Sequence, residues 1–195
     1  IAVLEQLRAV DSEFGNNIGN YLLYETYMAY GSQRASYGLY LDATNKFEEA
    51  EFLVWDDQIS TPTRLFFTQI NIAYSAGKSH SYEQSVSYYE YAIEEFLNRS
   101  NLRRDYENFG TLTKAEAFSS ESLHFDAFIN YAEFFKSAND VVYDYTEITV
   151  TKGESLLDIA TEYGTSIQTI INVNNLPPQI MIIANDGALL IPLLP

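Results

Sequence analysis

The C-terminal segment, from about Tyr145 to Pro195, follows an order of structural signals that constrains the fold more than any other part of the chain. Residues 146–150 alternate between polar and branched apolar side chains, which is typical of a strand. Two short helical patterns follow at 156–164 and 167–173, and residues 188–192 read as a closing strand. The order strand, helix, helix, strand predicts a small βααβ module.

Capping residues mark the ends of both predicted helices. Ser155 stands three residues before Asp158, so its hydroxyl can accept from the first backbone amides while the carboxylate favours the positive end of the helix dipole. Gly164 can take the left-handed conformation that ends a helix. Ser166 repeats the capping for the second helix, where we expect Asn174 to take the left-handed geometry at the end.

Each predicted helix of the module has one apolar face. The spacing i, i+3, i+4, i+7 places its members on one side. These residues are Leu156, Ile159, Ala160 and Tyr163 in the first helix and Ile167, Ile170 and Ile171 in the second. Pro177 and Pro178 forbid continuation of the second helix.

This succession of residues closely resembles the LysM family. The matching positions are Val150, Gly153, Glu154, Ser155, Leu156, Ile159, Ala160, Tyr163, Gly164, Ile167, Ile171, Asn174, Leu189, Ile191 and Pro192. The resemblance covers about a quarter of the chain. It departs from the family pattern at Asn185-Asp186-Gly187, where the family usually has a Gly-Gln pair entering the last strand.

The LysM resemblance implies binding rather than catalysis. The family packs two helices on one face of a two-stranded antiparallel sheet, and its ligands are N-acetylglucosamine polymers, peptidoglycan or chitin, held between the loop after the first strand and the loop after the second helix. The ligand-binding residues implied here are Gly153, Glu154, Ser155, Leu156, Asn175, Leu176, Pro177, Ile180 and Ile182. Each of these residue types also has an ordinary structural explanation as a turn glycine, a helix cap or a lead into a strand.

The charge of the chain disfavours some partners. The formal net charge is −16, and no basic stripe is present to replace counterions on nucleic acid. The module holds six acidic residues against Lys152 alone, a net charge of −5. Wall polymers are themselves anionic, so a neutral sugar contact would have to supply the affinity.

Residues 1–143 have a different composition. All but two of the 16 Tyr, 12 Phe and one Trp lie in this front part, which predicts an aromatic core. A chain of this length can bury such a core unaided. We therefore predict the α+β class, with a mainly helical domain at 1–143, including a short strand pair, and the βααβ module at 144–195.

The first half of the front part gives three kinds of pattern. Residues 2–10 carry an apolar stripe and predict a helix, and residues 20–30 fit either a helix or a buried strand. Tyr37, Leu39 and Leu41 alternate and predict a short strand before a charged helix at 46–54.

The second half gives clearer helix signals. Thr61 and Pro62 predict a helix start, and the helix is expected to stop at Gly77. Residues 81–84 read as a capping box that opens a helix to Leu97, and residues 120–137 predict a last long helix.

A hairpin in this region faintly resembles a tetratricopeptide repeat. The residues that carry the resemblance are Gly77, Tyr82, Ser85, Tyr89 and Ala92. The turn is longer than the repeat allows and no second copy follows one repeat length away, so we interpret the segment as an ordinary antiparallel helical hairpin.

Catalytic and membrane signals are weak. His80 and His124 are far apart in sequence, the chain has no Cys, and no metal-ligand spacing, phosphate loop or activated nucleophile is visible. The acidic residues at 48, 49, 51, 56 and 57 read as a solvated helix side and turn. No apolar run reaches the roughly 18 residues that span a bilayer, and Glu5 and Arg8 argue against a signal peptide at 1–10.

These observations predict a non-enzymatic protein without cofactor or metal, and they leave two functions open. The first is a structural component whose LysM-like module docks it in a homo- or hetero-oligomeric assembly, such as a phage tail baseplate or a contractile injection machine. The short apolar junction at 137–145 motivates it, because flexible linkers are rich in Ser, Pro and Gly. The alternative is a cell-wall protein that binds peptidoglycan or chitin. The corresponding locations are a virion or tail assembly and the bacterial cell envelope.

Overall fold

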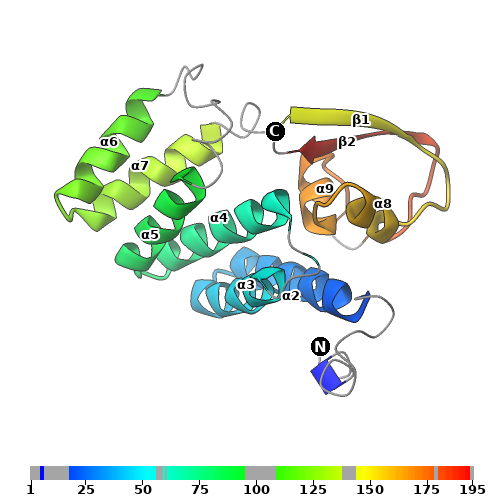
Figure 1. Ribbon diagram of the computed structural model, residues 1–195, viewed down its shortest axis with the longest axis horizontal. Coiled ribbons are helices and arrows are strands. Elements are labelled where there is room, and N and C mark those ends of the chain that lie inside the picture. Colours follow the sequence, from blue (N-terminus) through cyan, green and yellow to red (C-terminus); the bar gives the residue numbers. More distant parts are fainter. Residues whose placement is uncertain are drawn as a thin grey trace.

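The computed structural model describes residues 5–6, 18–55, 59, 61–94, 109–137, 144–177 and 180–193. Helices dominate, and a two-stranded antiparallel sheet lies near the C-terminus (Figure 1). The elements are α2 (Ile18–Ser36), α3 (Tyr40–Trp55), α4 (Pro62–Lys78), α5 (Tyr82–Ala92), α6 (Phe109–Ser120), α7 (His124–Ser137), β1 (Asp144–Val150), α8 (Leu156–Glu162), α9 (Ile167–Val173) and β2 (Gly187–Leu193). This confirms the predicted α+β class.

The C-terminal module has the predicted βααβ order. β1 pairs with β2 from Asp144 opposite Leu193 to Val150 opposite Gly187. The Ser155 hydroxyl caps α8 by accepting from Leu157 N–H and Asp158 N–H, and the Ser166 hydroxyl caps α9 by accepting from Thr169 N–H. Gly164 has φ +64°, as expected for the residue that ends α8. The local capping signals therefore place both helices correctly.

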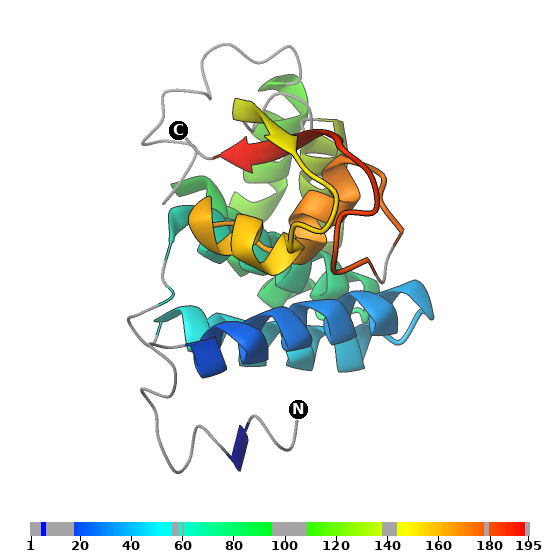
Figure 2. The same ribbon diagram turned by 90° about the vertical axis from the view of Figure 1, so that its right-hand side faces the viewer.

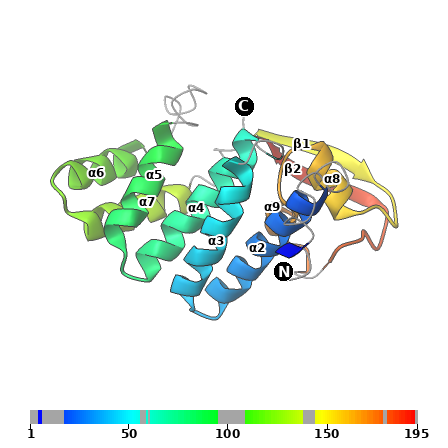
Figure 3. The same ribbon diagram turned by 60° about the horizontal axis from the view of Figure 1, so that its bottom comes forward.

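The six helices α2 to α7 form three antiparallel hairpins that share one turn geometry. The hairpins are α2–α3, α4–α5 and α6–α7, and the first four of these helices lie in a row (Figure 3). A residue in the left-handed conformation stands at positions 38, 80 and 122, one every 42 residues: Gly38 (φ +76°), His80 (φ +69°) and Ser122 (φ +59°).

The hydrogen bonds around these three turns are also equivalent. In each turn the amide after the left-handed residue donates five residues back: Leu39 to Arg34 (3.0 Å), Ser81 to Ala76 (2.9 Å) and Leu123 to Phe118 (2.9 Å). The left-handed residue itself donates three residues back, so each helix ends in a Schellman motif.

Side-chain size follows the same 42-residue period. A small buried residue recurs at Ala43, Ser85 and Ala127, and a buried ring recurs at Phe47, Tyr89 and Tyr131. The α4–α5 hairpin is thus antiparallel, as predicted, but it has structural counterparts before and after it. Its spacing of 42 residues exceeds the roughly 34 residues of a tetratricopeptide repeat, which is why no copy is visible at that length.

The predicted strand at 37–41 is wrong. Tyr37 and Gly38 lie in the first turn, and α3 begins at Tyr40, earlier than the predicted start at 46. Leu39 and Leu41 are 44% and 61% exposed. Their alternation arises from a turn and the first turn of a helix rather than from a half-buried sheet.

Three helix boundaries also differ from the prediction. The helix predicted at 120–137 begins later, at His124, because residues 121–123 form the turn after α6, which ends at Ser120. α4 continues through Gly77 to Lys78. The Ser81 side chain makes no capping hydrogen bond, so the predicted capping box does not form, and α5 ends at Ala92. Residues 95–97 and most of the helix predicted at 2–10 lie outside the described part of the chain.

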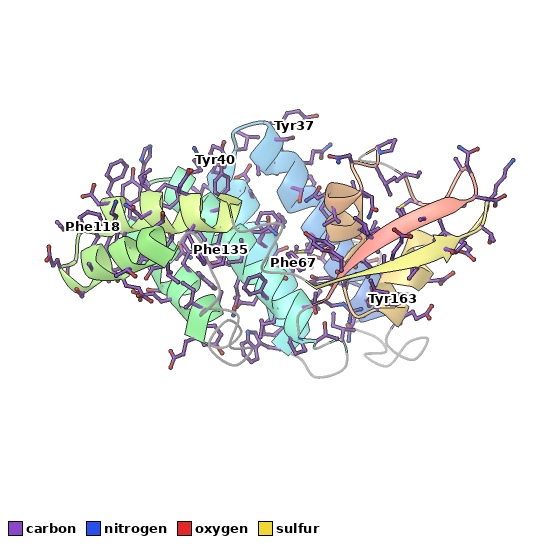
Figure 4. All side chains as sticks on the ribbon, turned by 90° about the horizontal axis from the view of Figure 1, so that it is seen from above. Tyr37, Tyr40, Phe67, Phe118, Phe135 and Tyr163 are labelled. Atoms are coloured by element: carbon purple, nitrogen blue, oxygen red, sulfur yellow. The ribbon has the colours of Figure 1, made fainter. Side chains whose placement is uncertain are left out.

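Two apolar cores share helix α4. The first core joins α2, α3 and the module and includes Leu65 and Ile72 of α4. The second core joins α5, α6 and α7 and includes Phe66, Phe67 and Ala73 of α4. Figure 4 shows Phe67 and Phe135 in the middle of the molecule, whereas Tyr37 lies at the outer end of the first hairpin. α4 is therefore covered on both sides.

Buried polar groups fix the module on the first helices. Arg64 of α4 is 4% exposed and donates to the carbonyl oxygens of Thr165 (3.3 Å), Ala160 (3.4 Å) and Ile59 (2.7 Å). Glu25 of α2 accepts from the backbone N–H of Ile167 at 3.0 Å, where α9 begins. α8 and α9 lie between the sheet and α2 (Figure 2). The predicted division at residue 143/144 stays a prediction, since residues 138–143 lie outside the described part.

Candidate functional site

The two loops implied by the LysM resemblance are joined by backbone hydrogen bonds. Gly153 N–H donates to Ile183 O (2.8 Å), Ile183 N–H donates to Glu154 O (2.8 Å), and Leu156 N–H donates to Met181 O (3.0 Å). Ser155 and Ile182 lie opposite each other as an isolated antiparallel bridge. The described residues of the two loops therefore form one surface, which we call the loop face: residues 153–156, 175–177 and 180–183.

The structure brings eight of the nine predicted contact residues to the surface of this face. Gly153, Glu154, Asn175, Pro177 and Ile182 are exposed, and Ser155, Leu176 and Ile180 are half-buried. Leu156 is 0% exposed and belongs to the first core. The Leu156 side chain is thus a core residue, and a ligand contact at this position stays a prediction that only its backbone could meet.

The apolar part of the loop face is a pair of neighbouring side chains. Met181 is 51% exposed and Ile182 is 58% exposed. Met181 was not among the predicted contacts, although its position between Ile180 and Ile182 in an otherwise apolar loop was a usable signal. Two adjacent exposed apolar side chains can cover a methyl group of a ligand, since apolar contact removes their surface from water.

The turn at Gly153 leaves open space beside this pair. Gly153 has φ +99°, and a Cβ added there would meet nothing within 4 Å. The glycine is therefore required by the backbone conformation, which side chains rarely adopt, rather than by crowding. Two neighbouring side chains are engaged within the protein: Ser155 Oγ caps α8, and Glu154 Oε1 accepts from the Thr151 hydroxyl at 2.9 Å. The amides of Gly153, Glu154 and Leu156 are also engaged, so the carbonyl oxygens of the turn, which have further lone pairs, remain as polar contacts for a ligand.

The departure from the family pattern at 185–187 has a structural role. The Asp186 carboxylate accepts from Lys152 N–H at 2.7 Å. This bond ties the end of β1 to the start of β2, at the base of the loop face. Asp186 thereby holds the two loops in register.

Asn174 also has a role that sequence reasoning assigned incorrectly. The left-handed residue after α9 is Asn175 (φ +50°), whereas Asn174 has φ −95°. The Asn174 side chain instead donates to Leu190 O and accepts from Leu190 N–H, both at 2.8 Å. It therefore clamps α9 to β2 below the loop that carries Pro177.

The rest of the described chain offers little catalytic chemistry. In residues 5–6, 18–55, 59, 61–94, 109–137, 144–177 and 180–193, no group of three or more His, Asp or Glu is placed to hold a metal ion. His80 Nδ1 lies 2.6 Å from the Tyr82 hydroxyl in the second turn, and His124 begins α7. No helix in this part is long and apolar enough to span a membrane.

Two of the acidic residues predicted to lie on a solvated helix side, Glu48 and Glu51, bond to other helices instead, whereas Glu49 is partly exposed beside Lys46 and residues 56 and 57 lie outside the described part. Glu48 accepts from Gln84 Nε2 at 2.6 Å, and Glu51 accepts from Gln69 Nε2 and the Tyr88 hydroxyl, both at 3.0 Å. Burial raises the pKa of Glu48. These carboxylates face α4 and α5 because the hairpins stack side by side, an arrangement that one helix pattern does not reveal.

Comparison with known proteins identifies only the module. The family model described as LysM domain matches residues 148–186. No curated protein and no solved structure matches the chain. LysM is a binding domain rather than a catalytic one, and its presence supports a peptidoglycan- or chitin-binding, cell-wall-associated role. The C-terminal βααβ module of this protein is a LysM domain.

Proposed function

We propose that this protein is a non-catalytic cell-wall-binding protein that holds an N-acetylglucosamine polymer, in peptidoglycan or chitin, on the loop face. The observation that carries the proposal is the exposed Met181–Ile182 pair beside the open turn at Gly153. The pair covers the methyl of an N-acetyl group, and backbone groups of the turn bond its amide. The LysM match over residues 148–186 gives this arrangement its context.

The helical hairpins act as a rigid mount in this proposal. Arg64 and Glu25 hold α8 and α9 from below, while the loop face lies at the end of the molecule away from α6 (Figures 1 and 3). A polymer chain can therefore reach the loop face without meeting the hairpins. Because the module is fixed, binding costs little additional ordering of the protein.

Electrostatics supports a neutral contact. Glu154, Asp158 and Asp186 lie exposed around the loop face, and Lys152 is the basic residue beside them. An anionic polymer gains no long-range attraction from this surface. We therefore expect the affinity to rest on the N-acetyl contact and to rise slightly, rather than fall, with added salt.

The test is co-sedimentation of the full chain with insoluble peptidoglycan and with chitin. Retention is expected for the unchanged protein and a loss of roughly tenfold for Ile182→Ser, which removes the central apolar contact. Leu190→Ser is the matched control, since Leu190 is 39% exposed on β2 outside the loop face. Equal retention of both variants, or no retention of the unchanged protein on either polymer, contradicts the proposal.

A second function is favoured by the buried polar join between module and hairpins. In it, the LysM domain is a rigid docking element of a larger assembly, such as a phage tail baseplate or a contractile injection machine, with protein subunits as partners. Arg64 and Glu25 prevent the module from swinging as a tethered wall binder does. Light scattering of the full chain distinguishes the two: a defined ring or mixed complex without polymer binding supports docking, and a monomer retained on the polymer opposes it.

A further inference from the structure

We propose that a cavity between α3, α4 and α5, far from the loop face in the sequence, binds a primary alkylammonium group, such as a lysine side chain of a partner. The cavity has a volume of about 270 Å³ and is lined by Glu51, Trp55, Gln69, Ser87, Tyr88 and Tyr91. Neither the LysM match nor the proposed glycan binding involves these residues. The inference is independent of that proposed function.

The walls of the cavity are aromatic. The ring centroids of Trp55 and Tyr91 lie 6.4 Å apart with an interplanar angle of 71°. Trp55 is 53% exposed and Tyr91 is 38% exposed, so a ligand can reach both rings. Aromatic faces carry negative electrostatic potential and attract a cation placed within about 6 Å of the ring centre.

The polar groups of the cavity offer mainly hydrogen-bond acceptors. The Glu51 carboxylate already accepts from Gln69 Nε2 and from the Tyr88 hydroxyl, and each of its oxygens has a further lone pair. Gln69 is 1% exposed, so its Nε2 holds the Glu51 carboxylate from behind the cavity wall while its buried Oε1 is out of a ligand's reach.

Tyr88 does not compete as a second anion. Burial, together with the neighbouring Glu51 and Glu48 carboxylates, raises the pKa of the Tyr88 phenol. The hydroxyl therefore stays protonated at neutral pH and donates to Glu51. The cavity keeps one carboxylate, Glu51, and among the described residues this carboxylate has no basic partner.

Charge selects a cation over a neutral ligand. Glu48 lies one helical turn before Glu51, and the chain as a whole has a net charge of −16. A primary ammonium carries donors that the free lone pairs of the Glu51 carboxylate can accept, while its alkyl stem lies against Trp55. A quaternary ammonium has the charge but no donors, and a neutral sugar has donors but no charge.

The test uses the fluorescence of Trp55, the one Trp of the chain, as a local reporter. The full-length protein is titrated at constant ionic strength with n-butylammonium, tetramethylammonium and N-acetylglucosamine. We expect saturable binding of n-butylammonium, with at least tenfold weaker binding of the other two. Equal or tighter binding of tetramethylammonium overturns the role of the donors, and equal or tighter binding of the sugar overturns the choice of a cation.

Variants separate the cavity from general electrostatics. Glu51→Gln keeps the shape and removes the charge, because its oxygen can still accept from Gln69 Nε2 while its NH2 group donates to the Tyr88 hydroxyl oxygen. At least a tenfold loss of n-butylammonium binding is expected. Glu121→Gln, in the exposed turn between α6 and α7, removes the same charge elsewhere and leaves binding unchanged. An equal loss in both variants, or no loss in Glu51→Gln while its thermal unfolding matches the unchanged protein, overturns the proposal.

Discussion

The two apolar cores on either side of α4 are built by different means. The first core joins segments that are distant in sequence, because Tyr21 and Arg64 both bond to the carbonyl of Thr165 in the module. The second core is built from neighbouring hairpins and is dominated by stacked rings, such as Tyr89 on Phe135 at 5.1 Å and 12°. The first core thus depends on buried polar bonds for its register, and the second on the shapes of aromatic side chains.

This difference shows what fixes the packing geometry of each core. Local hairpins with a repeated turn already bring their rings together, so the second core needs few polar guides. The LysM domain meets α2 and α4 without a local turn to guide it, and the buried polar groups define one docking geometry. Buried ionic groups are costly unless all their hydrogen bonds are made. The docking geometry of the LysM domain is therefore sensitive to substitution of these groups.

The largest effect is expected from Arg64→Met. The change removes three hydrogen bonds from a charged donor to backbone carbonyls, which together cost about 3–5 kcal/mol. The free energy of unfolding in urea measures the loss. Lys78→Met, on the exposed end of the same helix, is the control and should stay within about 0.5 kcal/mol of the unchanged protein. An equal loss in both variants would contradict the role of the three bonds that join Arg64 to the carbonyls.

The second core is tested by Gly77→Ala. A Cβ at position 77 would lie 2.2 Å from ring atoms of the buried Phe128, so the two hairpins must move apart. We expect a loss of about 2 kcal/mol, the usual cost of overpacking, despite the better helix propensity of Ala. Gly110→Ala is the matched control, because a Cβ there meets nothing within 4 Å, and it should be neutral or slightly stabilising. Similar stabilities for both variants would show that the packing of rings is tolerant.

The polar join also predicts a pH dependence. Burial raises the pKa of Glu25 from 4.5 to about 8, so the folded protein holds this proton more tightly than the unfolded chain. Stability from this group is full below about pH 4.5 and is lost as the pH rises towards 8. Glu25→Gln removes the loss and should be more stable than the unchanged protein at pH 9 but not at pH 4.5. Urea unfolding at the two pH values tests this, and an equal difference at both contradicts it.

The smallest effect compares two serines at helix starts. Ser155 accepts from two backbone amides of α8, whereas Ser81 makes no capping bond at α5. Ser155→Ala should cost about 1 kcal/mol, and Ser81→Ala should stay within about 0.5 kcal/mol. Thermal unfolding of the two variants is sufficient to rank them. A larger loss for Ser81→Ala would mean that the capping box forms after all.

Predictions from the sequence were correct where the interactions join residues that are close in the chain. Ser155, Ser166 and Gly164 act on backbone groups within a few residues, so the helices of the LysM domain were predicted correctly. The turn at Ser122 was missed because serine carries no helix-breaking signal, although it takes the same left-handed conformation as Gly38. The 42-residue period was hidden for the same reason, since it conserves conformation and size rather than residue type.

Contacts between segments that are distant in the chain could not be predicted from the sequence. Nothing near Arg64 in the sequence predicts that its partners lie at Ala160 and Thr165, and the charged residues of α3 carry no sign that Glu51 meets Gln69 and Tyr88. The loop face was predicted in outline because the family resemblance supplied it. Leu156 differs from the other predicted contacts because its side chain is buried in the core, and an apolar residue type alone does not separate a core position from a ligand contact.

A helix that belongs to two cores ties their unfolding together. Leu65 and Ile72 on one side of α4, and Phe66 and Ala73 on the other, lose their partners at once when α4 unwinds. Neither the LysM domain with the first hairpin nor the last two hairpins can then open as a separate cooperative unit. Hydrogen exchange should find the slowest amides in α4, with one shared opening free energy on its two faces, so that a ligand bound at either end protects both.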